Sequence, residues 1–150
     1  MWYPQCTSSK VSSAFAEIRP SGGTILAPVL QTALQQFFDK AELSTAKGTP
    51  VRKMTIVVVT DGRPQDKEDV ITTIVDTATK LKALKGSRDW IGIDFVQIGT
   101  DKGASAFLKE LDDDLVVKHK ASFDLVSTIP LSMVEQRGGV LAVLLDAIQK

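Results

Sequence analysis

The chain has 150 residues, 43% of them hydrophobic, and its 18 basic side chains balance 18 acidic ones. This length and composition suit one globular domain, residues 1–150, with a sizeable core. The balanced charge lacks the basic excess or cluster that a nucleic-acid-binding surface needs.

Single cysteine and histidine residues exclude further classes of protein. Cys6 alone can form neither an intrachain disulfide nor a cysteine zinc site. His119 stands between two lysines and is predicted to be a surface residue, so a Ser-His-Asp triad is not expected. The stretch MWYPQCTSSK lacks the apolar segment of a signal peptide, and VLAVLLDAI is too short to span a bilayer. We therefore expect an intracellular, cytoplasmic protein that binds neither membranes nor nucleic acid.

The first part of the chain is predicted to hold an irregular segment and one helix. Residues 1–13 show no helical or strand period. Over residues 26–43, LAPVLQTALQQFFDKAEL, apolar side chains recur at steps of three and four, which predicts an amphipathic helix. Gly22 and Gly23 provide a flexible turn before it, and Thr24 stands where a helix N-cap is expected.

Two apolar strands and a helix are predicted next. The run MTIVVVT, residues 54–60, is dense in β-branched residues and predicts a strand buried on both faces. An apolar stripe from Asp66 to about Lys85 predicts a helix that ends at Gly86. The run WIGIDFVQI, residues 90–98, predicts a second strand.

The last third of the chain predicts two helices around a third strand. The helices cover about residues 104–111 and 134–148, and LVVKH, residues 115–119, is the candidate strand. Alternation of helices and strands indicates an α/β fold. We expect a doubly wound, mostly parallel, Rossmann-like sheet with helices on both faces.

Oxygen-bearing side chains fall where such folds bind ligands, beyond the carboxyl ends of the strands. Asp61 and Asp101 each follow a predicted strand, and Thr24 joins them if its helix starts on the same side. Carboxylate and hydroxyl oxygens suit hard cations such as magnesium. The alternative is that Thr24 is only an N-cap and that Asp61 and Gly62 only form a turn.

Common catalytic motifs are absent. No GxxxxGK[ST], GxGxxG or GxSxG string occurs, which removes the phosphate-binding loop, the dinucleotide fingerprint and the usual serine hydrolase elbow. A haloacid dehalogenase-type phosphatase needs a second Asp two residues after the first, and Arg63 occupies that place. We therefore do not expect an enzyme. A small metal-dependent α/β enzyme that uses Asp61 is the remaining catalytic alternative.

Several stretches in order resemble the von Willebrand factor type A domain, and more narrowly its intracellular fungal members. They are PSGGTILAPVLQTAL, MTIVVVTDGRPQD, WIGIDFVQIGTD, AFLKELDDDL and FDLVSTIP, and they span about Phe15 to Pro130. The resemblance implies a metal-ion-dependent adhesion site. Such a site binds a divalent cation, usually Mg²⁺, through Asp-x-Ser-x-Ser, a Thr of the GGT turn and the Asp of the TDG strand.

Thr24 and Asp61 match the last two of these ligands, but no Asp-x-Ser-x-Ser string occurs in the chain. We therefore expect an N-terminally truncated or degenerate copy that binds Mg²⁺, Mn²⁺ or Ca²⁺ weakly or not at all. We also expect the central strand of the family to be missing, which would leave the TDG strand as an apolar edge prone to self-association.

The resemblance favours a protein-binding module in which an acidic residue of the partner completes the metal's coordination. Arg63, Pro64, Gln65 and Asp101 are then candidate partner-binding residues beside Thr24 and Asp61. A remnant without metal that self-associates through the strand edge is the main alternative. The run Asp112–Asp114 could mimic a cation site, although such runs at helix ends are usually solvated surface.

Overall fold

The computed structural model describes residues 9, 13, 23–136, 138–139 and 142. Most of the predicted irregular segment, residues 1–13, therefore lies outside the described residues. In chain order the elements are α2 (Ala27–Ala46), β1 (Met54–Thr60), α3 (Lys67–Ala83), a 3₁₀ turn (Arg88–Trp90), β2 (Ile91–Gln97), α4 (Lys102–Asp113), β3 (Val126–Pro130) and α5 (Leu131–Gln136).

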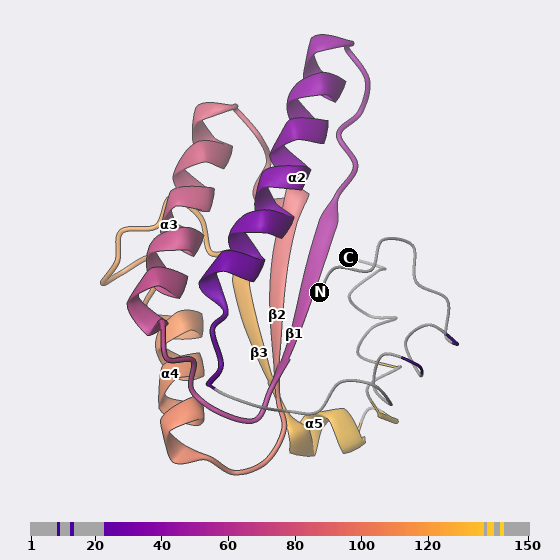
Figure 1. Ribbon diagram of the computed structural model, residues 1–150. Helices are drawn as coiled ribbons and strands as arrows, with labels where there is room; N and C mark the ends of the chain where they lie inside the picture. The colour runs from indigo at the N-terminus through magenta and orange to yellow at the C-terminus, as the bar shows by residue number, and fades with distance from the viewer. Residues whose placement is uncertain (1–8, 10–12, 14–22, 137, 140–141, 143–150) are drawn as a thin grey trace.

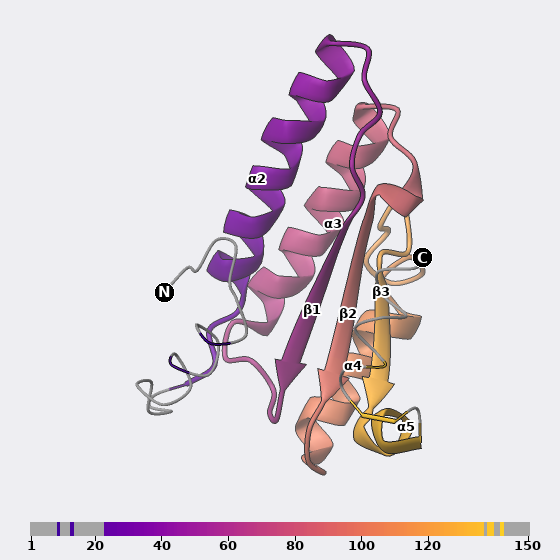
Figure 2. The same cartoon turned by 90° about the vertical axis from the view of Figure 1, so that its right-hand side faces the viewer.

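The three strands form one parallel sheet in the order β1-β2-β3. Val57 pairs with Asp94, and Asp94 pairs with Ser127, so the strands run in register with their carboxyl ends at one edge. Helix α3 connects β1 to β2 and helix α4 connects β2 to β3, as parallel pairing requires (Figures 1 and 2). This arrangement confirms the predicted α/β fold.

One face of the sheet packs against α2, α3 and α4 around the main hydrophobic core. The centre of that core is β2, whose Ile93 and Phe95 are fully buried. The helices contribute the apolar stripes that the sequence predicts, including Leu34, Ile74 and Leu111. The periodic apolar residues therefore form the buried side of each helix, as their spacing predicts, and they determine which side of the helix faces the sheet.

Strand β1 is the outer strand of the sheet within the described residues, because it pairs only with β2. The prediction that it is buried on both faces is wrong. Its residues are mostly half-buried, and the Val59 side chain is 50% exposed. Strand β2, by contrast, is buried at six of seven positions. A strand with a neighbour on one side only cannot reach that burial.

The end of the chain differs from the prediction in two places. The third strand is Val126–Pro130, whereas residues 115–119 form a turn after α4, so LVVKH is not a strand. Leu115 completes the core, but Val117 is 78% exposed. The closing helix was predicted over residues 134–148, most of which lie outside the described residues. Helix α5 overlaps only residues 134–136 of that stretch, and its Val134 packs against the other face of the sheet.

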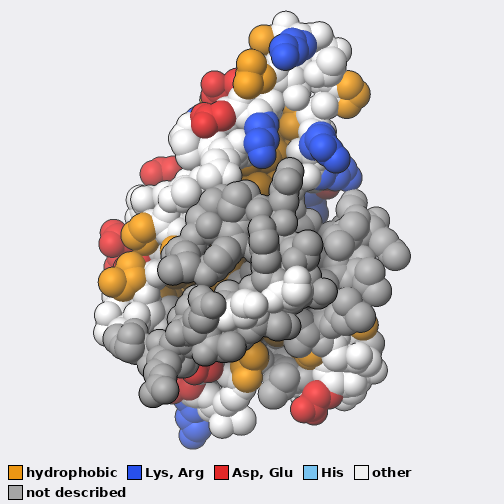
Figure 3. Space-filling view, turned by 45° about the vertical axis from the view of Figure 1, so that its right-hand side comes forward, with side chains coloured by type: hydrophobic (Ala, Val, Ile, Leu, Met, Phe, Trp, Pro, Cys, Tyr) orange, Lys and Arg blue, Asp and Glu red, His pale blue; other side chains and the backbone are white. Residues whose placement is uncertain are grey.

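Two surface properties follow from this architecture. In the described part of the chain, no helix combines the length and the apolar character needed to cross a membrane. Blue Lys and Arg side chains gather around orange hydrophobic side chains in the upper half of Figure 3, where α2 ends and the chain returns towards β1.

Candidate functional site

Asp61 follows β1 in a turn that its neighbours fix. The Thr60 side chain is 9% exposed, and its hydroxyl donates a hydrogen bond of 2.8 Å to the carbonyl oxygen of Gly62. Beyond the last paired residue of β2, the Ile98 N–H donates to the carbonyl oxygen of Thr60 at 2.8 Å. These bonds hold the end of β1, while Asp61 itself is exposed.

Asp101, which follows β2, caps a helix. Its carboxylate accepts a hydrogen bond of 2.6 Å from the Ala104 N–H at the start of α4. The Gln97 side chain donates to the Asp101 carbonyl oxygen at 3.2 Å and to the Ser105 hydroxyl at 2.9 Å. The chain can turn at this point because Gly99 adopts a φ of +83°, which other residues rarely reach. Asp101 therefore has a structural role at the rim.

The predicted N-cap of α2 is wrong. The cap position is Leu26, not Thr24, and no side chain at that position accepts a hydrogen bond. Asp66 supplies the acceptor instead. Its carboxylate receives the N–H of Leu26 at 2.9 Å and the N–H of Ala27 at 2.7 Å. A side chain forty residues along the chain thus caps the helix, which local sequence rules cannot anticipate.

These bonds govern the protonation of Asp66. Burial by itself would raise the pKa of the carboxyl group, but hydrogen bonds from the backbone of Leu26, Ala27 and Asp66 itself outweigh that effect and lower the pKa below its ordinary value. The carboxylate form is the acceptor that the first N–H groups of α2 need.

Thr24 lies beside the loop that follows Asp61. The Gln65 N–H donates a hydrogen bond of 2.8 Å to the carbonyl oxygen of Thr24. The Gln65 side chain lies so close to Gly23 that a Cβ atom there would collide with its amide group. Because Gln65 is exposed and its amide is the end of a flexible side chain, a larger residue at this position would displace that amide rather than the backbone. The Thr24 side chain is exposed, and its hydroxyl forms no hydrogen bond with the residues that the structure describes.

A shallow hollow of about 590 Å³ lies at the carboxyl ends of β1 and β2. It is lined by Asp61, Gly62, Arg63, Asp101 and Gly103. Within the described residues, neither the Asp61 carboxylate nor the Arg63 guanidinium has a hydrogen-bond or ion-pair partner. Thr24 is not part of the lining, and Pro64 is buried. The hollow thus brings together Asp61, Arg63 and Asp101 from the predicted residues.

The three carboxylates of the edge therefore differ in what they do. Asp66 and Asp101 are engaged with the first N–H groups of α2 and α4. Asp61 alone among the three remains available to a ligand. Among the described residues, no group of three or more His, Cys, Asp or Glu side chains could hold a metal ion. Asp61 and Thr24 would supply two of the six oxygens that magnesium prefers.

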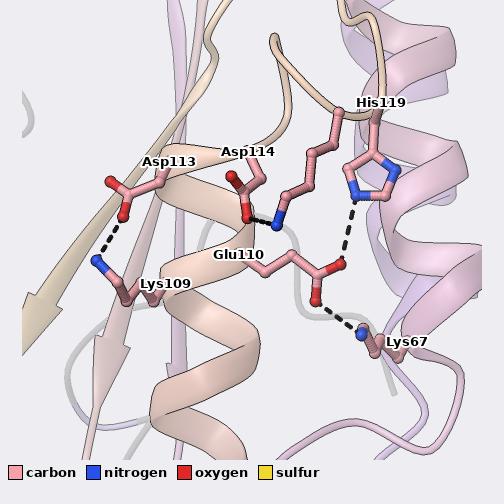
Figure 4. Close-up of polar contacts among 7 residues, drawn as sticks. Lys67, Lys109, Glu110, Asp113, Asp114 and His119 are labelled. Carbon is pink, nitrogen blue, oxygen red and sulfur yellow. Dashed lines mark hydrogen bonds and ion pairs between the residues drawn. The ribbon is translucent and has the colours of Figure 1, made fainter.

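The acidic run at the end of α4 does not form a cation site. Its three carboxylates have separate partners, and Figure 4 shows two of them turned to different lysines. The Thr128 hydroxyl donates to Asp112 at 2.7 Å, Lys109 pairs with Asp113 at 2.6 Å, and Lys118 pairs with Asp114 at 2.5 Å. Asp113 is exposed, whereas Asp112 and Asp114 are half-buried, so the expectation of a solvated surface holds fully only for Asp113.

Glu110 and His119 form a second polar contact near the same helix (Figure 4). Lys67, at the start of α3, lies 2.7 Å from Glu110, and the His119 Nε2 atom lies 3.4 Å from the other Glu110 oxygen. His119 makes no well-formed hydrogen bond through that atom, so the contact becomes an ion pair only when the ring is protonated. The predicted surface histidine is in fact partly buried.

One polar residue that the sequence reasoning missed is Asp94, in the middle of β2. It is 7% exposed and accepts a hydrogen bond of 2.7 Å from the Ser127 hydroxyl of β3. It borders a hollow of about 560 Å³ at the opposite end of the sheet from Asp61. A charged residue inside the apolar run IGIDFVQ was the available signal, since such a residue needs a partner when buried.

Exposed apolar side chains surround the edge that carries Asp61. Ile25 and Val29, around the start of α2, are 61% and 59% exposed, and Ile98, just after β2, is 40% exposed. Val59 and Met133, at the end of β1 and in α5, are 50% and 46% exposed. These five residues lie in or next to elements that begin or end at this edge, and contiguous apolar surface is typical of sites that bind other proteins.

Comparison with protein-family models and with curated proteins finds no match to this chain. The fold class therefore follows from the structure. Membership of the von Willebrand factor type A family, and the metal site that the resemblance implies, stay predictions based on the motifs.

Proposed function

We propose that this chain is a protein-binding module, similar to von Willebrand factor type A domains, that recognises its partner at the carboxyl edge of the sheet. The observation that carries the proposal is the state of Asp61, an exposed carboxylate without a partner among the described residues. Arg63, which has no partner among the described residues, lines the same hollow, and exposed apolar side chains lie in or next to elements that begin or end at the same edge of the sheet.

A divalent cation is the proposed bridge between Asp61 and the partner. Asp61 and the hydroxyl of Thr24 would hold Mg²⁺, or Mn²⁺ or Ca²⁺ in its place, and an acidic residue of the partner would complete the coordination. The cation would supply electrostatic attraction rather than catalysis. Two protein oxygens hold magnesium poorly, so we expect affinity for the free cation in the millimolar range at best.

Calorimetric titration with Mg²⁺ and Mn²⁺ tests the cation. We compare the native chain with Asp61→Ala, Thr24→Ala and a matched control, Asp76→Ala, which removes an exposed carboxylate from the middle of α3. If the heat of cation binding disappears in Asp61→Ala and Thr24→Ala but remains in Asp76→Ala, the result supports the proposed ligands. Absence of heat from the native chain at millimolar cation would leave protein binding without a metal bridge.

Crosslinking tests the protein-binding surface itself. Partners captured by the native chain should be lost with Asp61→Lys and kept with Asp76→Lys. Capture that does not change with Asp61→Lys would overturn the proposed surface.

Self-association is the second candidate function, and the open strand favours it. Strand β1 has a single neighbour within the described residues, and its Val59 is half exposed. Apolar outer strands of this kind can pair with another chain. The module would then act as a homo-oligomer whose edge residues have no metal.

A further inference from the structure

A second surface lies at the opposite end of β1 from Asp61. An apolar groove of about 550 Å³ runs between the second half of α2 and the residues that lead into β1. Phe37, Ala41 and Leu43 line it from the helix, and Val51 and Met54 line it from the chain that enters the strand. Its volume falls within the range of about 300–1,000 Å³ that is usual for small-molecule sites.

The charged side chains of the groove all have one sign. Lys40, Arg52 and Lys53 belong to the lining, and the lining contains no acidic residue. Lys40 and Arg52 are exposed, and neither forms an ion pair with any residue that the structure describes. Figure 3 shows Lys and Arg side chains beside hydrophobic ones on this part of the surface. The groove is thus complementary to an apolar body that bears a negative charge.

The lining favours a hydrocarbon chain over a peptide as the apolar body. Its neutral polar side chains are Gln36 and Ser44 only. A peptide carries an N–H and a C=O group at nearly every residue. The outer edge of β1 could pair with some of these groups in an extended peptide, but the others would be costly to bury without partners. A hydrocarbon chain needs no such partners, and a carboxylate at its end would find two cations at the rim.

We propose that this groove binds a single-chain alkyl carboxylate of the fatty-acid class. The alkyl chain lies against Phe37, Leu43 and Val51, and the carboxylate lies between Lys40 and Arg52. The inference is independent of the proposed function, because it uses none of the residues at the carboxyl edge of the sheet. It adds a ligand site to a chain whose other end is the proposed protein-binding surface.

Calorimetry with dodecanoate below its micelle concentration tests the site, with dodecyltrimethylammonium as the probe of opposite charge. Dodecanoate should bind one to one. Shortening the probe by one methylene should weaken binding by up to about fourfold, the value of one buried methylene. Dodecyltrimethylammonium should bind much more weakly. Equal binding of the two probes, or no binding of dodecanoate, would overturn the proposal.

Two kinds of variant locate the site. The double variant Lys40→Glu, Arg52→Glu should weaken dodecanoate binding by about tenfold or more, because it reverses the charges that pair with the carboxylate. Ser44→Trp leaves the charges in place and should weaken binding by filling the groove. The control is Lys82→Glu, an exposed lysine of α3 away from the groove, which should bind as the native chain does.

One further variant distinguishes the groove from the proposed protein-binding edge at Asp61. Asp61→Ala should bind dodecanoate as well as the native chain, whatever it does to cation or protein binding. Circular dichroism checks that each variant is folded. Folded groove variants that bind dodecanoate as tightly as the native chain would place the ligand elsewhere and overturn the proposal. So would an acidic leucine–glutamate peptide that competes with dodecanoate and binds more tightly.

Discussion

Asp66 and Ala27 join the starts of two helices. The Ala27 N–H, in the first turn of α2, donates a hydrogen bond of 2.7 Å to the carboxylate of Asp66, which precedes α3. The two helices pack side by side on the sheet (Figure 1), so the bond fixes the relative position of their N-termini. Next to it, the Gln65 N–H donates a hydrogen bond of 2.8 Å to the carbonyl oxygen of Thr24, so that the loop after Asp61 meets the turn before α2 at two bonds. The geometry of the proposed binding edge therefore depends on this carboxylate.

Removing the carboxylate should destabilise the whole chain. We expect Asp66→Ala to lower the free energy of unfolding by about 1–3 kcal/mol, because the N–H groups of Leu26 and Ala27 lose a charged acceptor. Urea denaturation monitored by circular dichroism measures the change. Asp76→Ala is the control and should stay within about 0.5 kcal/mol of the native chain. An equally small effect of Asp66→Ala would mean that water replaces the carboxylate without cost.

The contact of Glu110 with Lys67 predicts a pH dependence. The hydrogen bond from the Lys67 ammonium, partly opposed by burial, lowers the pKa of Glu110 below its ordinary value of 4.5. A lowered pKa in the folded chain means that the contribution to stability is complete above pH 4.5 and is lost as the pH falls through the folded-state value. The contribution is at most about 1 kcal/mol, because the pair is partly exposed.

Glu110→Gln should therefore reduce stability at neutral pH and make the acid limb of the stability curve shallower than that of the native chain. Thermal unfolding followed from pH 7 down to pH 3 measures both effects. Glu68→Gln, an exposed residue in the first turn of α3, is the comparison. A native and a Glu110→Gln curve that run parallel below pH 4.5 would show that the ion pair does not stabilise the fold.

The open outer edge of β1 predicts that the chain self-associates as its concentration rises. A single charge introduced on this strand should reduce that self-association. Val59→Lys places a charge on the exposed end of β1, which discourages pairing with another strand. Sedimentation velocity should then show less self-association than in the native chain, with little change in stability. Val117→Lys is the matched control, because Val117 is 78% exposed but lies in the turn after α4. If both variants reduce association equally, β1 is not the contact.

The sequence predicts the strands and helices whose periods are long and regular. The apolar runs of β1 and β2 and the stripe of α3 define their own elements, because each must bury one surface or face. The short run LVVKH has no such period. Its Leu115 is buried while Val116 and Val117 are exposed. The three apolar residues therefore belong to the turn that follows α4 and not to a strand. A run of three apolar residues is too short to distinguish a strand from a turn by its pattern.

The candidate site was predictable only in part, for a different reason. The rule that ligands bind beyond the carboxyl ends of strands places Asp61 and Asp101 at one edge, as the hollow between them confirms. It cannot assign their roles. Whether a carboxylate is free or caps a helix depends on which N–H groups lie near it. For Asp66 those groups belong to Leu26 and Ala27, forty and thirty-nine residues away.

Two substitutions of Asp101 distinguish a role as helix cap from a role in binding. Its carboxylate accepts the Ala104 N–H at 2.6 Å, so Asp101→Ala should destabilise the chain by about 1 kcal/mol through loss of the N-cap. Asp101→Ser supplies another capping oxygen without charge and should restore most of that stability. Urea denaturation of both variants measures the difference.

The same two variants then report on the binding edge. If Asp101 acts only as a cap, Asp101→Ser should bind the cation and the partner as the native chain does, while Asp61→Ala should not. If Asp101→Ser is as stable as the native chain but loses binding, the carboxylate is itself a ligand. The hollow would then use two acids rather than Asp61 alone, and Arg63, which also lines it, would be the residue that offsets their combined charge.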